Sequence, residues 1–158
     1  MKKEDKQLLL YGGGLIIAYF GLIRPILKKV GIVNSANDQL VNNYSNIANA
    51  ANPFSPIFWK QGGAGTSLIK VAATEALAAR IYDAMGYFTD DEAAVYSVFR
   101  TLKTQSQVSW LADIFQKKYG SDLFTFLQKG KGILPEAGLN SDEIAVIINL
   151  VNKLPKYK

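Results

Sequence analysis

The residues that could do chemistry in this chain are carboxylates, serines, lysines and tyrosines, because its 158 residues include no histidine and no cysteine. The commonest general base and the commonest transition-metal ligand are therefore missing. Disulfides and thiolate metal sites are excluded for the same reason. An enzyme made from this sequence would have to use carboxylates, a serine–lysine pair or a tyrosine.

Glu75 is the best single candidate for a catalytic group. It lies on an otherwise small, apolar helix face with Ala72, Ala76 and Ala79, where removal from water would favour the protonated carboxyl that a general acid needs. A membrane-tethered glycosidase or lytic transglycosylase would use such a glutamate. The alternative is that Glu75 stands at the edge of this face or pairs with a lysine or with Arg80. Because no second catalytic group accompanies it, we predict no catalytic residue and no enzyme.

The remaining acidic runs indicate helix starts. The run TDDE at 89–92 predicts a capping box, in which the Thr89 hydroxyl oxygen accepts the Glu92 amide and the Glu92 side chain returns the bond. The run NSDE at 140–143 predicts a second cap. Negative charge is favoured at a helix N-terminus, so we assign these carboxylates to structure.

The elements that would position these residues are helices. Apolar residues recur at helical spacing from Thr66 to the end of the sequence, and no strand pattern interrupts them. The last helix is nearly uncharged, so we expect it to be the central core helix. We therefore predict an all-α fold in which residues 66–158 form a compact bundle of about five helices. The spacing places four of these helices at 67–85, 105–118, 121–129 and 144–154, and the remaining one follows the cap at Thr89 with Val95, Val98, Phe99 and Leu102 on its apolar face.

Residues 8–27 are the most apolar stretch of the chain and decide where the rest of it lies. Residues 8–23 carry no charge, and Arg24 and Pro25 then interrupt the run. A helix of twenty residues spans about 30 Å, the thickness of a bilayer's hydrocarbon core. We interpret residues 1–32 as a single-pass membrane anchor. The side chains expected in lipid are Leu8, Leu15, Ile16, Phe20 and Ile23.

Two other interpretations of this stretch stay open. It could be a buried core helix, as shorter apolar runs often are. It could also be a cleaved signal peptide, although the run ends in RPILKK rather than in a small-x-small cleavage site. Within the stretch, Gly14, Ala18 and Gly21 share one helix face, on which another transmembrane helix could pack closely. The alternative is that glycine is simply common in membrane helices.

Residues 33–65 are interpreted as a polar, loosely structured arm between the anchor and the bundle. Asparagine and serine dominate its first half and favour turns over long helices, although the apolar spacing permits a short helix over 38–50. In the segment PFSPIFWK at 53–60, the prolines set an extended path. Its aromatic residues Phe54, Phe58 and Trp59 are candidates for docking into a neighbouring subunit. The alternative is that they pack on the chain's own domain.

The net charge of +5 is concentrated around the apolar stretch. Residues 1–60 hold seven basic and three acidic side chains, whereas residues 61–158 hold eleven basic and ten acidic ones. Basic residues beside an apolar segment are attracted by anionic headgroups. Nucleic-acid binding needs a clustered basic face, which the nearly neutral second part does not indicate. We expect a lipid bilayer and other structural subunits as partners, and no nucleic acid, small-molecule ligand, cofactor or metal.

Residues 79–129 resemble one repeat of the annexin family. The match includes the Ala-Met-Gly-x-x-Thr-Asp junction at 84–90 and the Tyr-Gly-x-Asp-Leu run at 119–123, with Gln105 or Gln107 between them near a helix start. The resemblance implies a helical repeat fold. In annexins it also implies calcium-dependent membrane binding, through the carbonyls of a Gly-x-Gly-Thr loop and a downstream acid.

The calcium motif of that family is altered here at the positions that would bind the ion. Phe88 replaces the second glycine of the loop, and Gln128 stands where the acid is expected. The earlier run GAGT at 63–66 matches the Gly-x-Gly-Thr pattern, but Gln105 stands near the position where its acid is expected. Calcium requires several oxygen ligands, carboxylate among them. The resemblance therefore predicts the fold, and we expect no metal site.

The overall layout also resembles bacteriophage virion proteins, with a short N-terminal anchor, an asparagine-rich arm and an Asn-Pro-Phe-x-Pro segment. We predict a non-enzymatic, membrane-anchored structural protein that links a bilayer to a protein shell or to neighbouring subunits, as a minor virion protein of a membrane-containing phage. The first alternative is a bacterial envelope protein whose helical domain binds a partner. The second is a membrane-tethered, carboxylate-dependent cell-wall hydrolase. Basic residues flank the anchor equally, so its orientation stays open.

Overall fold

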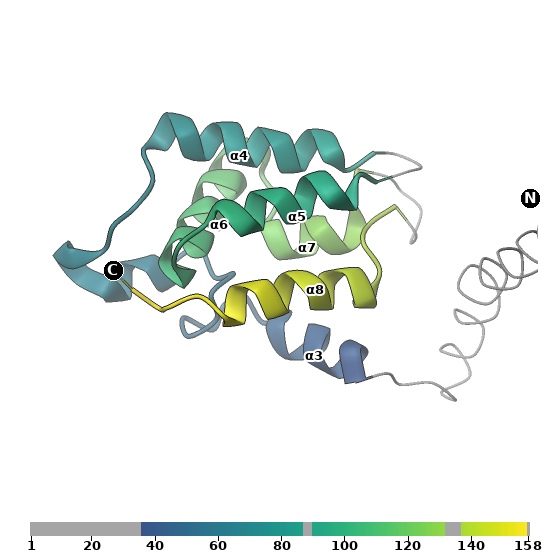
Figure 1. Ribbon diagram of the computed structural model, residues 1–158, viewed down its shortest axis with the longest axis horizontal. Coiled ribbons are helices and arrows are strands. Elements are labelled where there is room, and N and C mark those ends of the chain that lie inside the picture. The colour runs from purple at the N-terminus through teal and green to yellow at the C-terminus, as the bar shows by residue number, and fades with distance from the viewer. Residues whose placement is uncertain (1–35, 87–89, 132–136, 158) are drawn as a thin grey trace, which may run out of the picture. The chain divides into compact units, whose positions relative to one another are not determined.

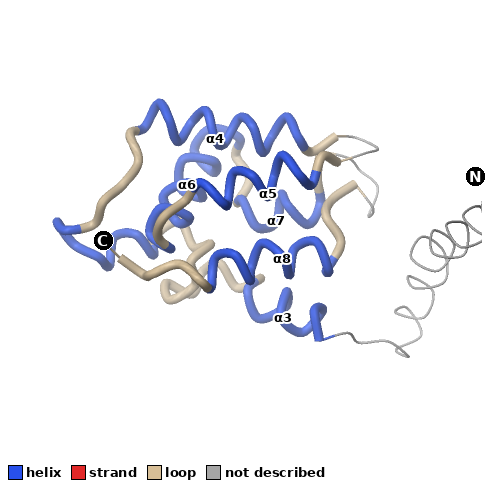
Figure 2. The backbone as a smooth tube through the Cα atoms, viewed as in Figure 1, coloured by secondary structure: helices blue, strands red, loops and turns tan. Residues whose placement is uncertain are grey.

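The computed structural model describes residues 36–86, 90–131 and 137–157 (Figure 1). All of them except Ala36 belong to one unit, Asn37–Lys158. The regular elements in these ranges are helices joined by loops (Figure 2). This confirms the all-α prediction for the described part of the chain.

The membrane anchor predicted over 1–32 lies outside the described residues. The same holds for its lipid-facing side chains and for the stripe of Gly14, Ala18 and Gly21. Within the described ranges, no helix combines the length and the apolar character that crossing a bilayer requires. The anchor therefore stays a prediction.

The helices follow one another along the chain with short connections. Five α-helices occur in the described residues from 66 onward, which is the number that the sequence predicted for this part. One antiparallel bridge, between Met85 and Asp90, is the only strand-like pairing in the described residues. The elements are α3 (Ala36–Tyr44), the 3-10 helix η2 (Phe58–Gly65), α4 (Val71–Ala84), α5 (Glu92–Thr101), α6 (Gln105–Tyr119), α7 (Leu123–Lys129) and α8 (Ser141–Asn152).

Polar side chains fix where four of these helices begin. The cap residues are Asp91 for α5, Thr104 for α6, Asp122 for α7 and Asn140 for α8, and each accepts a backbone amide of the first turn. At α8, the Glu143 carboxylate also accepts the Asn140 amide at 2.7 Å. This completes the capping box, so the cap predicted from the NSDE run is confirmed.

The other predicted capping box, before α5, is wrong. Helix α5 begins at Glu92, and the Asp91 Oδ1 atom accepts the Ala94 amide at 2.9 Å. The Asp90 carboxylate does not cap α5 but accepts the Gly86 amide, after the end of α4, at 3.0 Å. Because Glu92 is the first residue of the helix and not the third, its side chain is not placed to return the predicted bond.

Helix α4 begins later than its apolar spacing predicted, at Val71. The carbonyls of the preceding residues are engaged by side chains of α6. The Gln107 Nε2 atom donates to the Ser67 carbonyl at 3.2 Å, and the Trp110 Nε1 atom donates to the Ile69 carbonyl at 3.0 Å. Carbonyls held in this way are directed away from a helical ladder, so the chain passes over α6 in non-helical form before α4 starts.

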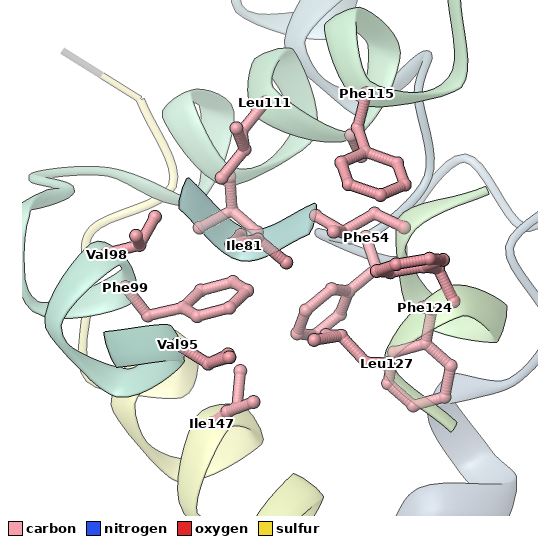
Figure 3. Packing of buried hydrophobic residues seen from close by; sticks show 14 of the residues in the cluster. Phe54, Ile81, Val95, Val98, Phe99, Leu111, Phe115, Phe124, Leu127 and Ile147 are labelled. Atoms are coloured by element: carbon pink, nitrogen blue, oxygen red, sulfur yellow. The ribbon is translucent and has the colours of Figure 1, made fainter. Parts of the chain in front are cut away.

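The centre of the domain is α6, and not the last helix as predicted. Helix α6 contacts α4, α7, α8 and η2, and nine of its residues between Ser106 and Phe115 are buried. Helix α8 keeps one face in solvent, where Val146 is 41% exposed. Apolar side chains from α3 to α8 form the core cluster. Figure 3 labels Phe54, Ile81, Val95, Val98, Phe99, Leu111, Phe115, Phe124, Leu127 and Ile147 from this cluster.

The asparagine-rich segment folds against the domain and is not the loose arm that was predicted. The Asn37 Nδ2 atom donates to the Asp142 Oδ1 atom at 2.8 Å, and the Tyr44 hydroxyl donates to the Asn152 Oδ1 atom. These bonds join the start of α3 to the start of α8 and the end of α3 to the end of α8. The two helices therefore lie parallel. The short helix permitted over 38–50 exists, but it ends at Tyr44.

One asparagine organises the chain between α3 and η2. The Asn52 Nδ2 atom donates to the carbonyls of Tyr44 and Asn46 at 2.7 and 3.2 Å, and its Oδ1 atom accepts the Phe54 amide at 3.0 Å. Phe54 is then fully buried, with the ring centroids of Tyr44 and Phe124 at 5.9 and 5.0 Å. Side-chain hydrogen bonds of Asn52, of the kind that favours turns, thus hold the backbone in the conformation that places Phe54 in the core.

The segment after α8 caps the start of α6. The carbonyls of Pro155 and Lys156 accept the amides of Gln105 and Ser106 at 2.9 and 3.1 Å. Amides in the first turn of a helix have no partner within the helix. Tyr157 then stacks on an aromatic ring of η2, with the ring centroids 5.3 Å apart. The chain after α8 is therefore part of the fold.

Candidate functional site

The helices give the domain two ends with different surfaces. Helix α4 ends where α5 and α8 begin, and the start of α3 lies at this same end (Figure 1). The other end holds η2, the starts of α4 and α6, and the chain after α8. We call them the acidic end and the basic end. The acidic end carries Asp83, Asp90, Asp91, Glu92, Asp142 and Glu143 with the cations Arg80 and Lys131 beside them, and the basic end carries Lys60, Lys70, Arg100, Lys103, Lys153 and Lys156.

A groove of about 780 Å³ opens at the acidic end between α4 and α5. We call it the acidic groove. Among the described residues, small apolar and charged side chains share its lining, with three carboxylates against one guanidinium. Such a surface favours a partner that brings a cation beside a modest apolar projection. The small residues are Ala76, Ala79, Ala84, Gly86 and Ala94, and the charged ones are Arg80, Asp83, Asp90 and Asp91.

The carboxylates of the acidic end repel one another in the folded chain. Burial raises the pKa of Asp90 and repulsion by Glu92 adds to this, while the hydrogen bond from the Gly86 amide opposes it. Burial also raises the pKa of Glu143, and repulsion by Glu92 and Asp90 adds to this against the bonds to Asn140. A cationic partner would therefore lower the electrostatic free energy of this end.

The basic end combines cations with exposed apolar side chains. Ile57 is 43% exposed and Val71 is 50% exposed, the two largest values among the large apolar side chains that are described. The Lys60 ammonium lies 5.7 Å from the centroid of the Trp59 ring. That ring packs edge-on against Trp110, with the centroids 5.0 Å apart. Exposed apolar side chains and cations are thus both present at this end.

The charge count along the sequence did not reveal this clustered basic face. The segments that form the basic end, 45–74, 100–109 and 150–157, contain no acidic residue. Lys70 is the N-cap residue of α4, and Lys103 directly precedes the cap of α6. Positive charge is unfavourable at a helix start, so helix stability does not account for these two lysines.

The three aromatic residues expected to dock on a partner are packed within the chain to different degrees. Phe54 is fully buried and Phe58 is 2% exposed, so the alternative of packing on the chain's own domain holds for both. Their burial follows from the turn held by Asn52 and from the stacking of Tyr157 on Phe58. Trp59 is partly exposed and belongs to the surface of the basic end.

Glu75, the best catalytic candidate of the sequence, is exposed on the outer side of α4. Its neighbours Ala72 and Ala76 are exposed as well, so the apolar face does not remove this carboxylate from water. In the described ranges, no group of three or more acidic side chains could hold a metal ion. The arrangement of the acidic groove and the basic end is suited to binding.

The residues of the annexin-like motifs have backbone roles here. Met85 and Asp90 pair in an antiparallel bridge between the end of α4 and the start of α5. Gly120 ends α6 with a φ of 72°, a conformation that favours glycine, and Asp122 caps α7. These roles do not test the resemblance, which stays a prediction. Comparison with models of protein families, with curated proteins and with solved structures gives no match to this chain.

Proposed function

We propose that this chain is a non-enzymatic, membrane-anchored structural protein. Its helical domain links the bilayer that holds residues 1–32 to a protein shell or to neighbouring subunits. The setting that we propose is the virion of a membrane-containing bacteriophage, in which it is a minor structural protein. The apolar residues 8–27 support the anchor, and the two charged ends of the domain support its binding role.

One observation carries the proposal, namely that the domain is fixed from its first helix onward. Asn37 and Tyr44, near the two ends of α3, are bonded to Asp142 and Asn152 of α8. The chain over 28–35, between the apolar stretch and α3, spans at most roughly 28 Å even when fully extended. An attachment to lipid would therefore reach the folded core through a short connection, as a link between a bilayer and a protein layer requires.

The chain after α8 supports the same role. Its carbonyls cap α6, and Tyr157 stacks on Phe58. The ends of a domain usually fray unless something ties them down. Here both the first helix and the last residues described are tied to the core, which favours a protein that must keep its shape under attachment.

Membrane fractionation of the expressed chain, with and without residues 1–31, tests the anchor. We expect the full chain to stay with membranes through carbonate washing, because residues 8–27 lie in the bilayer. The shortened chain should be soluble and should keep a helical circular dichroism spectrum. A full chain that is soluble without detergent would overturn the proposal, since residues 8–27 would then be a buried helix.

Purification of phage particles tests the proposed setting. We expect the protein in purified particles and expect detergent to release it together with lipid. Its recovery only from the envelope of uninfected bacteria would favour the alternative, an envelope protein whose helical domain binds a partner. A cell-wall degradation assay of the native chain and of Glu75→Gln addresses the hydrolase. Activity that this variant loses would replace the structural proposal.

A further inference from the structure

We propose that the partner of the acidic groove is the basic end of a second copy of this chain. In this contact, the basic end of one copy lies against the acidic groove of the next, so that copies associate head to tail. The inference rests on the proposed function, because it identifies one of the neighbouring subunits as the same protein.

The two surfaces have opposite charge. The described residues that line the acidic groove include three carboxylates and one guanidinium, and further acids at that end already repel one another. The basic end has six exposed cations, and the segments that form it contain no acid. Complementary potentials of this kind select the partner and accelerate its association.

The apolar parts of the two surfaces also match. At the basic end, Val71 follows Lys70 directly and Ile57 lies three positions before Lys60. These exposed aliphatic side chains stand beside the cations, as the alanines of the groove stand beside its carboxylates. An aliphatic side chain that enters a groove lined by alanine loses contact with water without displacing bulky residues.

The location of the two surfaces means that the basic end can meet an acidic groove only in another copy. They lie at opposite ends of one domain (Figure 1), so a copy cannot fill its own groove. A contact between two different patches is heterologous, and each added copy leaves one patch of each kind available. Contact with carboxylates would also offset the unfavourable placement of Lys70 and Lys103 at helix starts.

The test uses the full chain in neutral detergent micelles, with the protein mass measured by light scattering. The basic-end variant is Lys60→Glu with Lys70→Glu. The groove variant is Asp83→Lys with Asp91→Asn, in which asparagine keeps the cap of α5. Circular dichroism and tryptophan fluorescence establish that both variants remain folded.

A matched control changes two exposed lysines that belong to neither surface, Lys118→Glu with Lys129→Glu. We expect the native chain and this control to form oligomers whose mass falls as the salt concentration rises. Each of the two surface variants alone should be monomeric. An equimolar mixture of the two should form a dimer and nothing larger, because one intact basic end then meets one intact groove.

Three outcomes would overturn the inference. The first is a native chain that stays monomeric at every concentration, or a mixture of variants that does. The second is association that persists in both surface variants, which places the contact elsewhere in the chain. The third is oligomers that form only after phosphatidylglycerol is added, which assigns the basic end to anionic lipid.

These outcomes are separable from those of membrane fractionation. If the chain stays with membranes but does not associate, only the head-to-tail contact is overturned. If the chain is soluble without detergent, the proposed anchor is overturned, whatever the mass of the protein in solution.

Discussion

Two parts of the domain reach the same core by different means. From residue 66 onward, amphipathic helices bury apolar side chains at regular spacing, and polar caps fix the starts of α5 to α8. Between 37 and 65, one short helix is followed by turns that asparagine side chains hold, and Asn52 delivers Phe54 to the core. The first part depends on periodicity, and the second depends on a few individual bonds.

The difference shows that polar composition does not measure how much a segment contributes to stability. In the regular helices, many apolar contacts share the stabilisation. In the asparagine-rich segment, the stabilisation depends on a few residues. Single substitutions there should therefore be as costly as substitutions in the helices, although the segment looks like a tether.

The largest effect is expected for Phe54→Ala. Removal of a fully buried phenylalanine lowers the free energy of unfolding by about 3–5 kcal/mol. Urea unfolding of the full chain, followed by tryptophan fluorescence, measures this, because Trp59 and Trp110 are the only two tryptophans and both lie in the domain. The control is Ile57→Ala, where the side chain is 43% exposed and the expected change is below about 0.5 kcal/mol. Equal effects of the two substitutions would contradict the comparison.

The second effect is expected for Asn52→Ala. It removes two donated bonds and one accepted bond, and it leaves the Phe54 amide without its partner inside the protein. The expected loss in the free energy of unfolding is about 1–3 kcal/mol. Asn43→Ala, at an exposed position of α3, is the matched control. If both asparagine variants unfold at the same urea concentration, the segment is held by something other than Asn52.

A smaller effect is expected at the start of α8. Asn140→Ala removes the acceptor for two first-turn amides, and the expected loss is about 1 kcal/mol. Asn140→Asp keeps a capping oxygen and should recover most of this loss. The same urea experiment compares them. Equal losses in the two variants would show that the cap does not act through its side-chain oxygen.

The smallest effect is expected from pH. The pKa values of Asp90 and Glu143 are raised in the folded chain above their ordinary values of 3.8 and 4.5. The folded chain therefore binds a proton on each of the two carboxyl groups more tightly than the unfolded chain does. The stability that this gives is present below the ordinary pKa values and is lost as pH rises through the raised pKa values of the folded chain. Glu143→Gln removes one of the two groups, so the urea midpoint should fall less steeply with pH than in the native chain. Parallel pH profiles would exclude this contribution.

The sequence was sufficient for features that depend on near neighbours. The helices after residue 66 could be predicted because their apolar residues share one period, and the cap of α8 because Asn140 and Glu143 are three positions apart. The start of α4 could not, since Gln107 and Trp110 that hold the preceding carbonyls lie 40 and 41 positions away from them. The burial of Phe54 could not be decided either, because its partners come from three separate elements.

The candidate site was the least predictable part of the molecule. Acidic and basic residues nearly cancel over 61–158, so a count along the chain indicates neither of the two ends. The fold separates them because α5 and α8 begin at one end while the chain that contains Lys60 and Lys70 lies at the other. The charge clusters are therefore a property of topology.

The capping of α6 by the chain after α8 also determines an order of events during synthesis. The Ser106 amide must wait for the Lys156 carbonyl, 50 positions later, before the start of α6 can close. From residue 27 to residue 157 there are 130 positions, which a ribosome that adds roughly 5–20 residues per second makes in about 7–26 s. If residues 8–27 form the proposed anchor, they leave the ribosome while the central helix is still open at one end, so insertion would precede the completion of folding.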